Sequence, residues 1–304
     1  MKAVVTGSAG FIGSHLVEAL LARGYRVTGI DRQSRPDRPG YRHAVLDVAD
    51  DPSRTGLAAL VSGAQIVFHL AARPGVRGIG PVLREMRRRD NVIATRSLLS
   101  VTPKAIPVVA VSSSSVYGGS RDGFPSREDD PLLPRGGYAR SKAEMERVCG
   151  MYRARGGGIA VVRPFTVAGE GQRPDMAFSS WLGALRRGDP IRILGSRDRS
   201  RDITDIRDAV EGLIRAGERQ VNETVNLGTG VTHRLIDLVQ ALMDVYGRET
   251  DVVVRPSLSE EVDVTLADTT RCAQLLGFVP RTDLHTLLAR QIGAAASAPA
   301  MVAT

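Results

Sequence analysis

The sequence has few of the residues that build disulfide frameworks and metal sites. It contains only two cysteines, Cys149 and Cys272, and each falls within a helical pattern, so neither a disulfide framework nor a thiolate zinc site is expected. The five histidines lie far apart, without the spacing of metal ligands, and no metal site is predicted. These features favour a reduced, cytoplasmic setting.

Long apolar runs are also missing. No stretch approaches the roughly 20 apolar residues that a membrane-spanning helix needs. The first residues, MKAVVTG, are predicted to begin a strand at once, which excludes a signal peptide with a separate apolar region. We therefore expect a soluble protein without a membrane partner.

Lysine is scarce, although the net charge is +8. Only Lys2, Lys104 and Lys142 are lysines, so arginine supplies nearly all of the positive charge. The arginines are spread along the chain apart from short runs such as 87–89, whereas a nucleic-acid interface gathers them into a patch or stripe. No nucleic-acid partner is expected.

The first half of the chain alternates short apolar runs with helical patterns. Continuous β-branched runs are typical of strands buried on both faces of a parallel sheet. The predicted strands cover residues 2–6, 26–31, 44–48, 65–71, 107–113 and 159–165. The clearest helical patterns between them cover 15–24, 81–100 and 138–155. This βαβ succession predicts an α/β fold, a Rossmann-type doubly wound parallel sheet, over residues 1–165.

After residue 165 the predicted strands and helices no longer alternate regularly. Helices are predicted at about 177–187, 206–218, 234–246 and 283–295, with short strands at 191–194 and 251–256. We expect residues 166–296 to form mainly a smaller C-terminal substrate-binding lobe, with some segments returning to the first domain. The small and featureless residues 297–304 are predicted to be a disordered tail.

The stretch GSAGFIG follows the first strand directly and opens a helix. Gly7 permits a tight turn, Gly10 lets the backbone approach a pyrophosphate, and Gly13 lets helix and strand pack closely. The helix N-terminus, with Phe11 and Ile12, then meets the phosphate charge. The pattern predicts a dinucleotide site.

Acidic residues follow the next two strands. Asp31 ends the second strand, where a carboxylate can hold the adenosine ribose hydroxyls and repel a 2′-phosphate, so NAD is favoured over NADP. The neighbouring Arg32 weakens that exclusion. Asp47 and Val48, after the third strand, are predicted to frame the adenine. The alternative for Asp31 is a solvated turn residue.

A serine-rich strand end and a helix supply candidate catalytic groups. VSSSSVYG (111–118) closes the fifth strand, and YARSK (138–142) opens the next helix. Tyr138 and Lys142 are four residues apart and therefore share one helical face, where an ammonium stabilises a phenolate. Such a tyrosine can act as a general base.

With these motifs together, the sequence resembles the extended short-chain dehydrogenase/reductase family, in particular its nucleotide-sugar epimerases and dehydratases. The resemblance covers nearly the whole chain, including GSAGFIG (7–13), HLAA (69–72), SSSSVYG (112–118), YARSK (138–142), RDITDIRD (201–208) and NLGTG (226–230). It implies that Ser113, Tyr138 and Lys142 are catalytic. It also implies that NAD is the cofactor, held in addition by Leu70, Ala71, Ala72, Tyr138, Lys142 and Phe165.

The resemblance also narrows the reaction. Dehydratases of the family have Asp-Glu beside the catalytic hydroxyl, and the related decarboxylases have a glutamate there, whereas this chain has Ser114 and Ser115. What remains is oxidation and re-reduction at one carbon, an epimerisation in which Tyr138 takes the C4 hydroxyl proton while hydride passes to NAD.

The stretch FTVAGEGQRPDMA is similar to that of UDP-glucuronate 4-epimerases. This similarity implies that Thr166 and Arg173 hold the C6 carboxylate, which guanidinium can bind bidentately. Further residues are implied to bind a UDP-sugar: Arg77, Ser113, Ser114, Met176, Arg192 and Arg201. Residues 258–261 (LSEE) depart from the family's second phosphate contact, and Arg255 is the candidate that compensates for it. Helices 81–100 and 138–155 correspond to the family's dimer interface, so a homodimer is expected.

Several alternatives stay open. Arg173 could be a surface loop residue or a phosphate ligand, and the substrate could be a neutral nucleotide sugar. Decarboxylation of UDP-glucuronate is a further candidate reaction. A non-enzymatic candidate is an NAD-binding regulator, against which the intact Ser113, Tyr138 and Lys142 argue.

Overall fold

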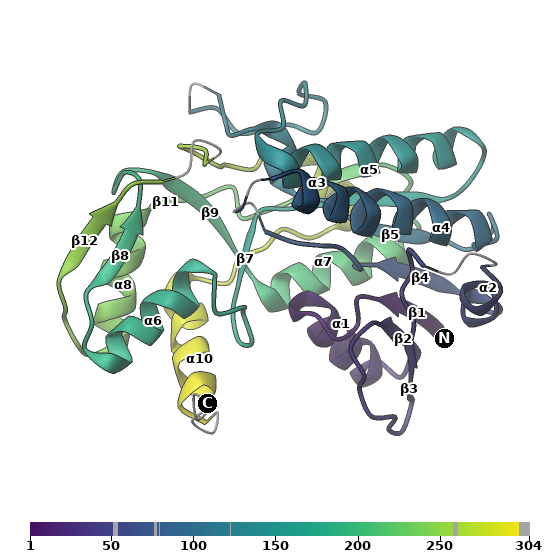
Figure 1. The fold of residues 1–304 in the computed structure, drawn as a ribbon, viewed down its shortest axis with the longest axis horizontal. Coiled ribbons are helices and arrows are strands. Elements are labelled where there is room, and N and C mark those ends of the chain that lie inside the picture. The colour runs from purple at the N-terminus through teal and green to yellow at the C-terminus, as the bar shows by residue number, and fades with distance from the viewer. Residues whose placement is uncertain (51–53, 76–77, 79, 122, 258–260, 298–304) are drawn as a thin grey trace.

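The computed structural model describes residues 1–50, 54–75, 78, 80–121, 123–257 and 261–297. Seven strands form one parallel sheet in the order β10-β6-β5-β4-β1-β2-β3 (Figure 1). Their bounds are β1 Lys2–Thr6, β2 Arg26–Asp31, β3 Tyr41–Val45, β4 Ile66–His69, β5 Val108–Val111, β6 Ile159–Pro164 and β10 Thr224–Leu227. The strand order reverses beside β1, which confirms the predicted Rossmann-type fold.

Helices cover both faces of this sheet (Figure 1). Ala3 and Val5 of β1 face a core shared with α1 and α7, whereas Val4 between them faces the core of α2, α4 and α5. The helices of the two layers are α1 Phe11–Ala22, α2 Thr55–Val61, α4 Ala94–Val101, α5 Gly136–Ala154, α7 Ile206–Glu218 and α9 Thr270–Leu276. Burial on both faces explains why these strands are continuous apolar runs.

A smaller set of elements packs at the other end of the molecule (Figure 1). A three-stranded sheet has the order β11-β9-β7, and β8 pairs with β12 in a two-stranded sheet. The bounds are β7 Thr166–Ala168, β8 Ile191–Leu194, β9 Ser200–Asp205, β11 Thr232–Arg234, β12 Val252–Arg255, α6 Ala177–Arg187, α8 Leu235–Tyr246 and α10 Leu284–Ser297. Trp181, Leu185 and Leu242 lie in their shared core.

The predicted helix over 81–100 is interrupted. α3 (Pro81–Arg87) passes into a π-helical turn, η1 (Arg88–Ile93), before α4 begins. Asp90 and Asn91, both in this turn, are buried. A π turn shifts the positions that face inwards, and such turns are frequent at functional sites.

Other boundaries differ less. β3 lies at 41–45 instead of 44–48, because it is the edge strand and only Tyr41 of its residues is buried. The predicted helices 177–187 and 206–218 are confirmed. Of the predicted tail 297–304, Ser297 ends α10 and the rest lies outside the described residues. No helix within the described ranges is long and apolar enough to cross a membrane.

Candidate active site

A cleft of about 940 Å³ opens at the carboxyl ends of the sheet strands. Its walls come from the ends of β1, β2, β4, β5 and β6 on one side, and from α6, β8 and β9 on the other. This is the position where open α/β sheets bind ligands, beside the reversal in strand order. The cleft therefore brings together both parts of the chain.

The glycine turn leaves room for a dinucleotide only because its residues lack side chains. Gly7 has φ +72°, and a Cβ there would lie 2.6 Å from the amide nitrogen of Ala71. A Cβ on Gly13 would lie 2.0 Å from the carbonyl oxygen of Gly7. α1 then begins at Phe11 after Gly10, which offers no side-chain cap to the helix amides. These amides suit a pyrophosphate, so the turn fits the predicted cofactor.

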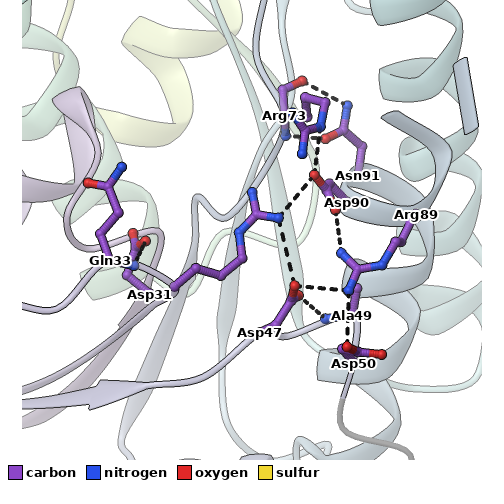
Figure 2. A network of polar contacts seen from close by, with 10 residues as sticks. Asp31, Gln33, Asp47, Ala49, Asp50, Arg73, Arg89, Asp90 and Asn91 are labelled. Carbon is purple, nitrogen blue, oxygen red and sulfur yellow. Dashed lines mark hydrogen bonds and ion pairs between the residues drawn. The ribbon is translucent and has the colours of Figure 1, made fainter. Parts of the chain in front are cut away.

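Asp31 is oriented by two backbone amides. Its carboxylate accepts a hydrogen bond of 3.0 Å from Ala9 N. It accepts a second, also of 3.0 Å, from Gln33 N (Figure 2). Ala9 belongs to the glycine turn, so the carboxylate is tied to the wall of the cleft. This is the position from which a carboxylate can reach a ribose hydroxyl.

Arg32, the next residue, turns towards acidic partners. Its Nη1 lies 3.4 Å from Oδ2 of Asp90 and 3.7 Å from Oδ2 of Asp47. Burial would raise the pKa of Asp47, but hydrogen bonds from Ala49 and Arg89 and the charges of Arg89 and Arg32 lower it. Asp47 is therefore an anion within an ion-pair cluster as well as a cleft residue.

The remaining predicted cofactor residues also line the cleft. Besides the glycines, Asp31, Arg32 and Asp47, they are Phe11, Ile12, Val48, Leu70, Ala71, Ala72, Tyr138, Lys142 and Phe165. Most are apolar, as is typical of small-molecule sites.

Ser113 and Tyr138 meet at the mouth of β5. Their side chains are hydrogen-bonded, and the Ser113 hydroxyl also accepts from Ser115 N at 3.2 Å, which fixes the start of the 3₁₀ turn η2 (Ser114–Tyr117). Burial raises the pKa of Tyr138, and it is opposed by the Ser113 hydrogen bond and by the charges of Arg173 and Arg87. The phenol is therefore protonated when the site holds no ligand.

Lys142 is buried beneath this pair. Its Nζ donates to the carbonyl of Val111 at 2.7 Å. Burial lowers the pKa of Lys142 to about 8, and Glu146 and Cys149 oppose this shift. That the ammonium of Lys142 stabilises the phenolate of Tyr138 stays a prediction. In this structure Arg173 and Arg87 are the cations that lower the tyrosine pKa.

The predicted acid-sugar residues lie on the opposite wall. Thr166, Arg173, Met176, Arg192 and Arg201 all line the cleft, as does Ser114 beside Ser113. The guanidinium of Arg173 forms a bidentate pair with Asp175, with Nε–Oδ1 at 2.9 Å and Nη2–Oδ2 at 3.1 Å.

Of the other predicted arginines, one lies away from the cleft and one falls outside the described residues. Arg255 is exposed at the end of β12 and does not line the cleft, because this strand pairs with β8 on the outer side of the smaller part. Arg77 falls outside the described residues. Arg201 lines the cleft, and its guanidinium donates to the backbone carbonyls of Ser200, Val262 and Asp263.

The loop that carries Arg173 is fixed by buried amides that sequence reasoning missed. Gln172 donates to Val167 O at 3.2 Å and accepts from the amide of Gln291 on α10, also at 3.2 Å. Ser179 of α6 donates to Gln172 O at 3.1 Å. The contact with Gln291 joins residues 119 positions apart, so no local pattern could have indicated it.

Arg87 was also missed. It begins the arginine run 87–89, which suggests a solvated face, yet its side chain is buried. Its Nη1 donates to Gly78 O at 3.1 Å and its Nη2 to Gly75 O at 2.8 Å. Arg87 thus holds the loop after β4 and places a cation near Tyr138.

The chain resembles known enzymes over its whole length. A sequence profile described as the NAD dependent epimerase/dehydratase family matches residues 3–228. YtcB of Bacillus subtilis (strain 168), named an uncharacterized UDP-glucose epimerase, is 33% identical over 96% of this chain and 97% of its own length.

Solved structures share the fold. UDP-glucuronic acid 4-epimerase from Bacillus cereus, in complex with UDP-glucuronic acid and NAD, matches with a TM-score of 0.89 and 30% identity, covering 97% of this chain and 98% of that one. MoeE5, in complex with UDP-glucuronic acid and NAD, matches with a TM-score of 0.88 and 34% identity, covering 97% and 99%. MoeE5 has also been solved with UDP-glucose and NAD.

These matches agree with the geometry of the cleft. NAD is the cofactor, and the glycine turn, the bare N-terminus of α1 and the Asp31 carboxylate have the geometry that suits a dinucleotide. The cleft, the Ser113–Tyr138 pair and the family profile lead to one conclusion: this chain is an enzyme of the NAD dependent epimerase/dehydratase family.

Proposed function

We propose that this enzyme interconverts UDP-glucuronate and UDP-galacturonate by epimerisation at C4, without loss of CO2. The observation that carries the proposal is the bidentate ion pair of Arg173 with Asp175 at the wall of the cleft. Asp175 engages two parallel donors of the guanidinium, and a uronate, which requires the same geometry, would take the place of that carboxylate. The charge of Arg173 also acts on Tyr138, which supports a position next to the reacting carbon.

A residue that holds the sugar carboxylate would hinder loss of CO2 during the reaction. When bound, NAD would supply the acceptor for a hydride from C4 and the donor that returns it to the opposite face. In the liganded site Tyr138 would act as the phenolate, take the C4 hydroxyl proton and later give it back as the phenol. The oxidised sugar is a β-keto acid, which loses CO2 fastest when the bond to its carboxylate aligns with the carbonyl. A carboxylate held by Arg173 and Thr166 can be kept out of that alignment.

The residues beside Ser113 argue against elimination. Ser114 and Ser115 line the cleft, and neither can supply the carboxyl group that water loss needs. The Ser115 hydroxyl is buried and has no hydrogen-bond partner among the described residues. It is therefore open to a polar group of the substrate. Arg201 is proposed to contact the pyrophosphate of UDP, and Arg192 and Met176 to bind the rest of the nucleotide sugar.

Arg173→Ala tests the clamp. Wild-type enzyme incubated with UDP-glucuronate should give the axial C4 product, followed by NMR, without CO2 release. The variant is expected to lose at least about 30-fold in kcat/KM for the acid sugar, because a desolvated carboxylate would have lost its partner. CO2 release per turnover should rise.

UDP-glucose serves as the matched control substrate, because it has no carboxylate. Any turnover of UDP-glucose should change much less in Arg173→Ala than turnover of the acid sugar. Unchanged kinetics on UDP-glucuronate would contradict the proposal. A pentose product from the wild-type enzyme would favour the decarboxylase alternative.

We further propose a cytoplasmic homodimer. Cys149 and Cys272 are buried free thiols, as suits a reducing compartment. Large apolar side chains are exposed on α3 and α5, namely Val82, Met86 and Met151. Such residues are suited to an interface between two copies, and light scattering would measure the mass in solution.

A further inference from the structure

A polar cluster at the adenosine end of the cleft ties Arg32 to a helix of the opposite layer. We call it the arginine–aspartate cluster; it consists of Arg32, Arg73, Arg89, Asp47, Asp50 and Asp90. Figure 2 shows Arg89 between Asp47 and Asp90, with Arg73 reaching Asp90 from the other side. Asp90 lies in the π turn η1 and is buried, with 6% of its surface exposed.

Asp90 is shared by three guanidinium groups. Its Oδ2 accepts from Arg73 Nε at 2.8 Å, and its Oδ1 accepts from Arg89 Nη1 at 2.7 Å. Arg32 makes the longest contact, at 3.4 Å to Oδ2. Arg32 is thus the third and longest guanidinium contact of a buried carboxylate that is also held by Arg73 and Arg89.

Arg32 occupies the position where the two nicotinamide dinucleotides are told apart. The carboxylate that ends β2 favours the free ribose hydroxyls of NAD, whereas an arginine nearby accommodates the 2′-phosphate of NADP. Arg32 directly follows Asp31, lines the cleft, and is 48% exposed at its side chain. An unpaired guanidinium there would be suited to a phosphate.

We propose that Asp90 is a specificity-determining residue for the cofactor, because it draws the Arg32 guanidinium away from the ribose 2′ position. With Arg32 held away, Asp31 is the one of these two charged side chains that faces the ribose, which favours NAD. The charges agree with this role. The cluster contains as many carboxylates as guanidinium groups, and Asp31 adds one further negative charge beside a site that a 2′-phosphate would enter.

Asp90→Asn keeps the shape of the side chain and removes its charge. Dissociation constants of NAD⁺ and NADP⁺ are measured by calorimetry on protein freed of bound nucleotide. The affinity for NADP⁺ relative to NAD⁺ is expected to rise at least about tenfold, the size of one charge-assisted hydrogen bond. Higher salt should reduce the gain, because a released Arg32 would act from an exposed position.

The double variant Arg32→Ala/Asp90→Asn separates this effect from a general loosening of the cluster. Its relative affinity for NADP⁺ should return to within about twofold of the wild type, since the released guanidinium is gone. If the gain persists without Arg32, or if Asp90→Asn changes the ratio by less than about twofold, the proposal is wrong.

Arg32→Ala alone gives a second test, should the loss of a buried charge prevent Asp90→Asn from folding. Because Arg32 is already held by Asp90, its removal should change the ratio of the two affinities by less than about twofold. A selective loss of NADP⁺ affinity of about tenfold would mean that Arg32 already serves the phosphate, and would overturn the proposal. These measurements use nucleotide binding alone, so they do not depend on which sugar is the substrate.

Discussion

Tyr138→Phe is expected to lower kcat by about 10³-fold, on whichever UDP-sugar the enzyme turns over. Phenylalanine preserves the ring in the cleft wall, but it has no proton to accept or donate. The hydroxyl that it removes is the one hydrogen-bonded to Ser113 and influenced by the charges of Arg173 and Arg87. Initial rates with saturating substrate would measure the loss.

Nucleotide binding should survive this substitution, because the glycine turn and Asp31 are untouched. Tyr152→Phe is the matched control: Tyr152 lies on the same helix, and its hydroxyl donates to Thr102 O at 3.3 Å, outside the residues of the cleft. This control should keep its activity. If Tyr138→Phe retained about a tenth of kcat or more, another group would have to transfer the proton.

Lys142→Met is expected to stabilise the nucleotide-free protein while lowering turnover at least about 10²-fold. Burial lowers the pKa of Lys142 from 10.5 to about 8 in the folded state. Below pH 8 Lys142 carries its ammonium charge in both the folded and the unfolded state, and burial destabilises this charge in the folded protein. A pKa that is lower by one in the folded state corresponds to about 1.36 kcal/mol of lost stability. The hydrogen bond to Val111, which methionine cannot make, offsets part of this cost, so a gain of about 2 kcal/mol is expected at pH 7.

The stability gained by Lys142→Met is expected to depend on pH, because it arises from the lowered pKa of Lys142. Between pH 8 and 10.5 the unfolded chain binds more protons at Lys142 than the folded protein, so the wild type gains stability as the pH rises. The difference in unfolding temperature between Lys142→Met and the wild type should therefore shrink from pH 7 to pH 10. Lys104→Met, which alters an exposed lysine, is the control and should show no such trend. A Lys142→Met protein that unfolds at a lower temperature at pH 7 would refute this account.

Much of the fold could be predicted because the relevant signals are local. β1 and β2 are apolar runs buried on both faces, and their predicted bounds are those observed. The glycine turn and Asp31 follow these strands directly. Parallel strands end at one edge of the sheet, so residues placed after successive strands converge there without further information.

The rest depends on contacts between distant parts of the chain. Nothing near Arg32 in the sequence indicates that it pairs with Asp90, which is 58 residues away. Arg87 belongs to a basic run that suggests a solvated face, and only the fold shows that it is buried against backbone carbonyls. Arg255 was proposed to replace a phosphate contact that the sequence lacks, and it does not line the cleft. Such outcomes follow from tertiary packing, which overrides local pattern.

The position of β10 at the edge of the large sheet has a practical consequence for dissecting this enzyme. Thr224–Leu227 pairs with Val161–Pro164 of β6, and the Asn226 side chain accepts the hydroxyl of Tyr117 at 2.6 Å. A fragment cut after β6 would expose an unprotected strand edge and strip a buried tyrosine of its partner, which invites aggregation. Chimeras that exchange the sugar-recognition segments between Thr166 and Arg201 should therefore return to the parent sequence before β10, so that this strand stays with its own scaffold.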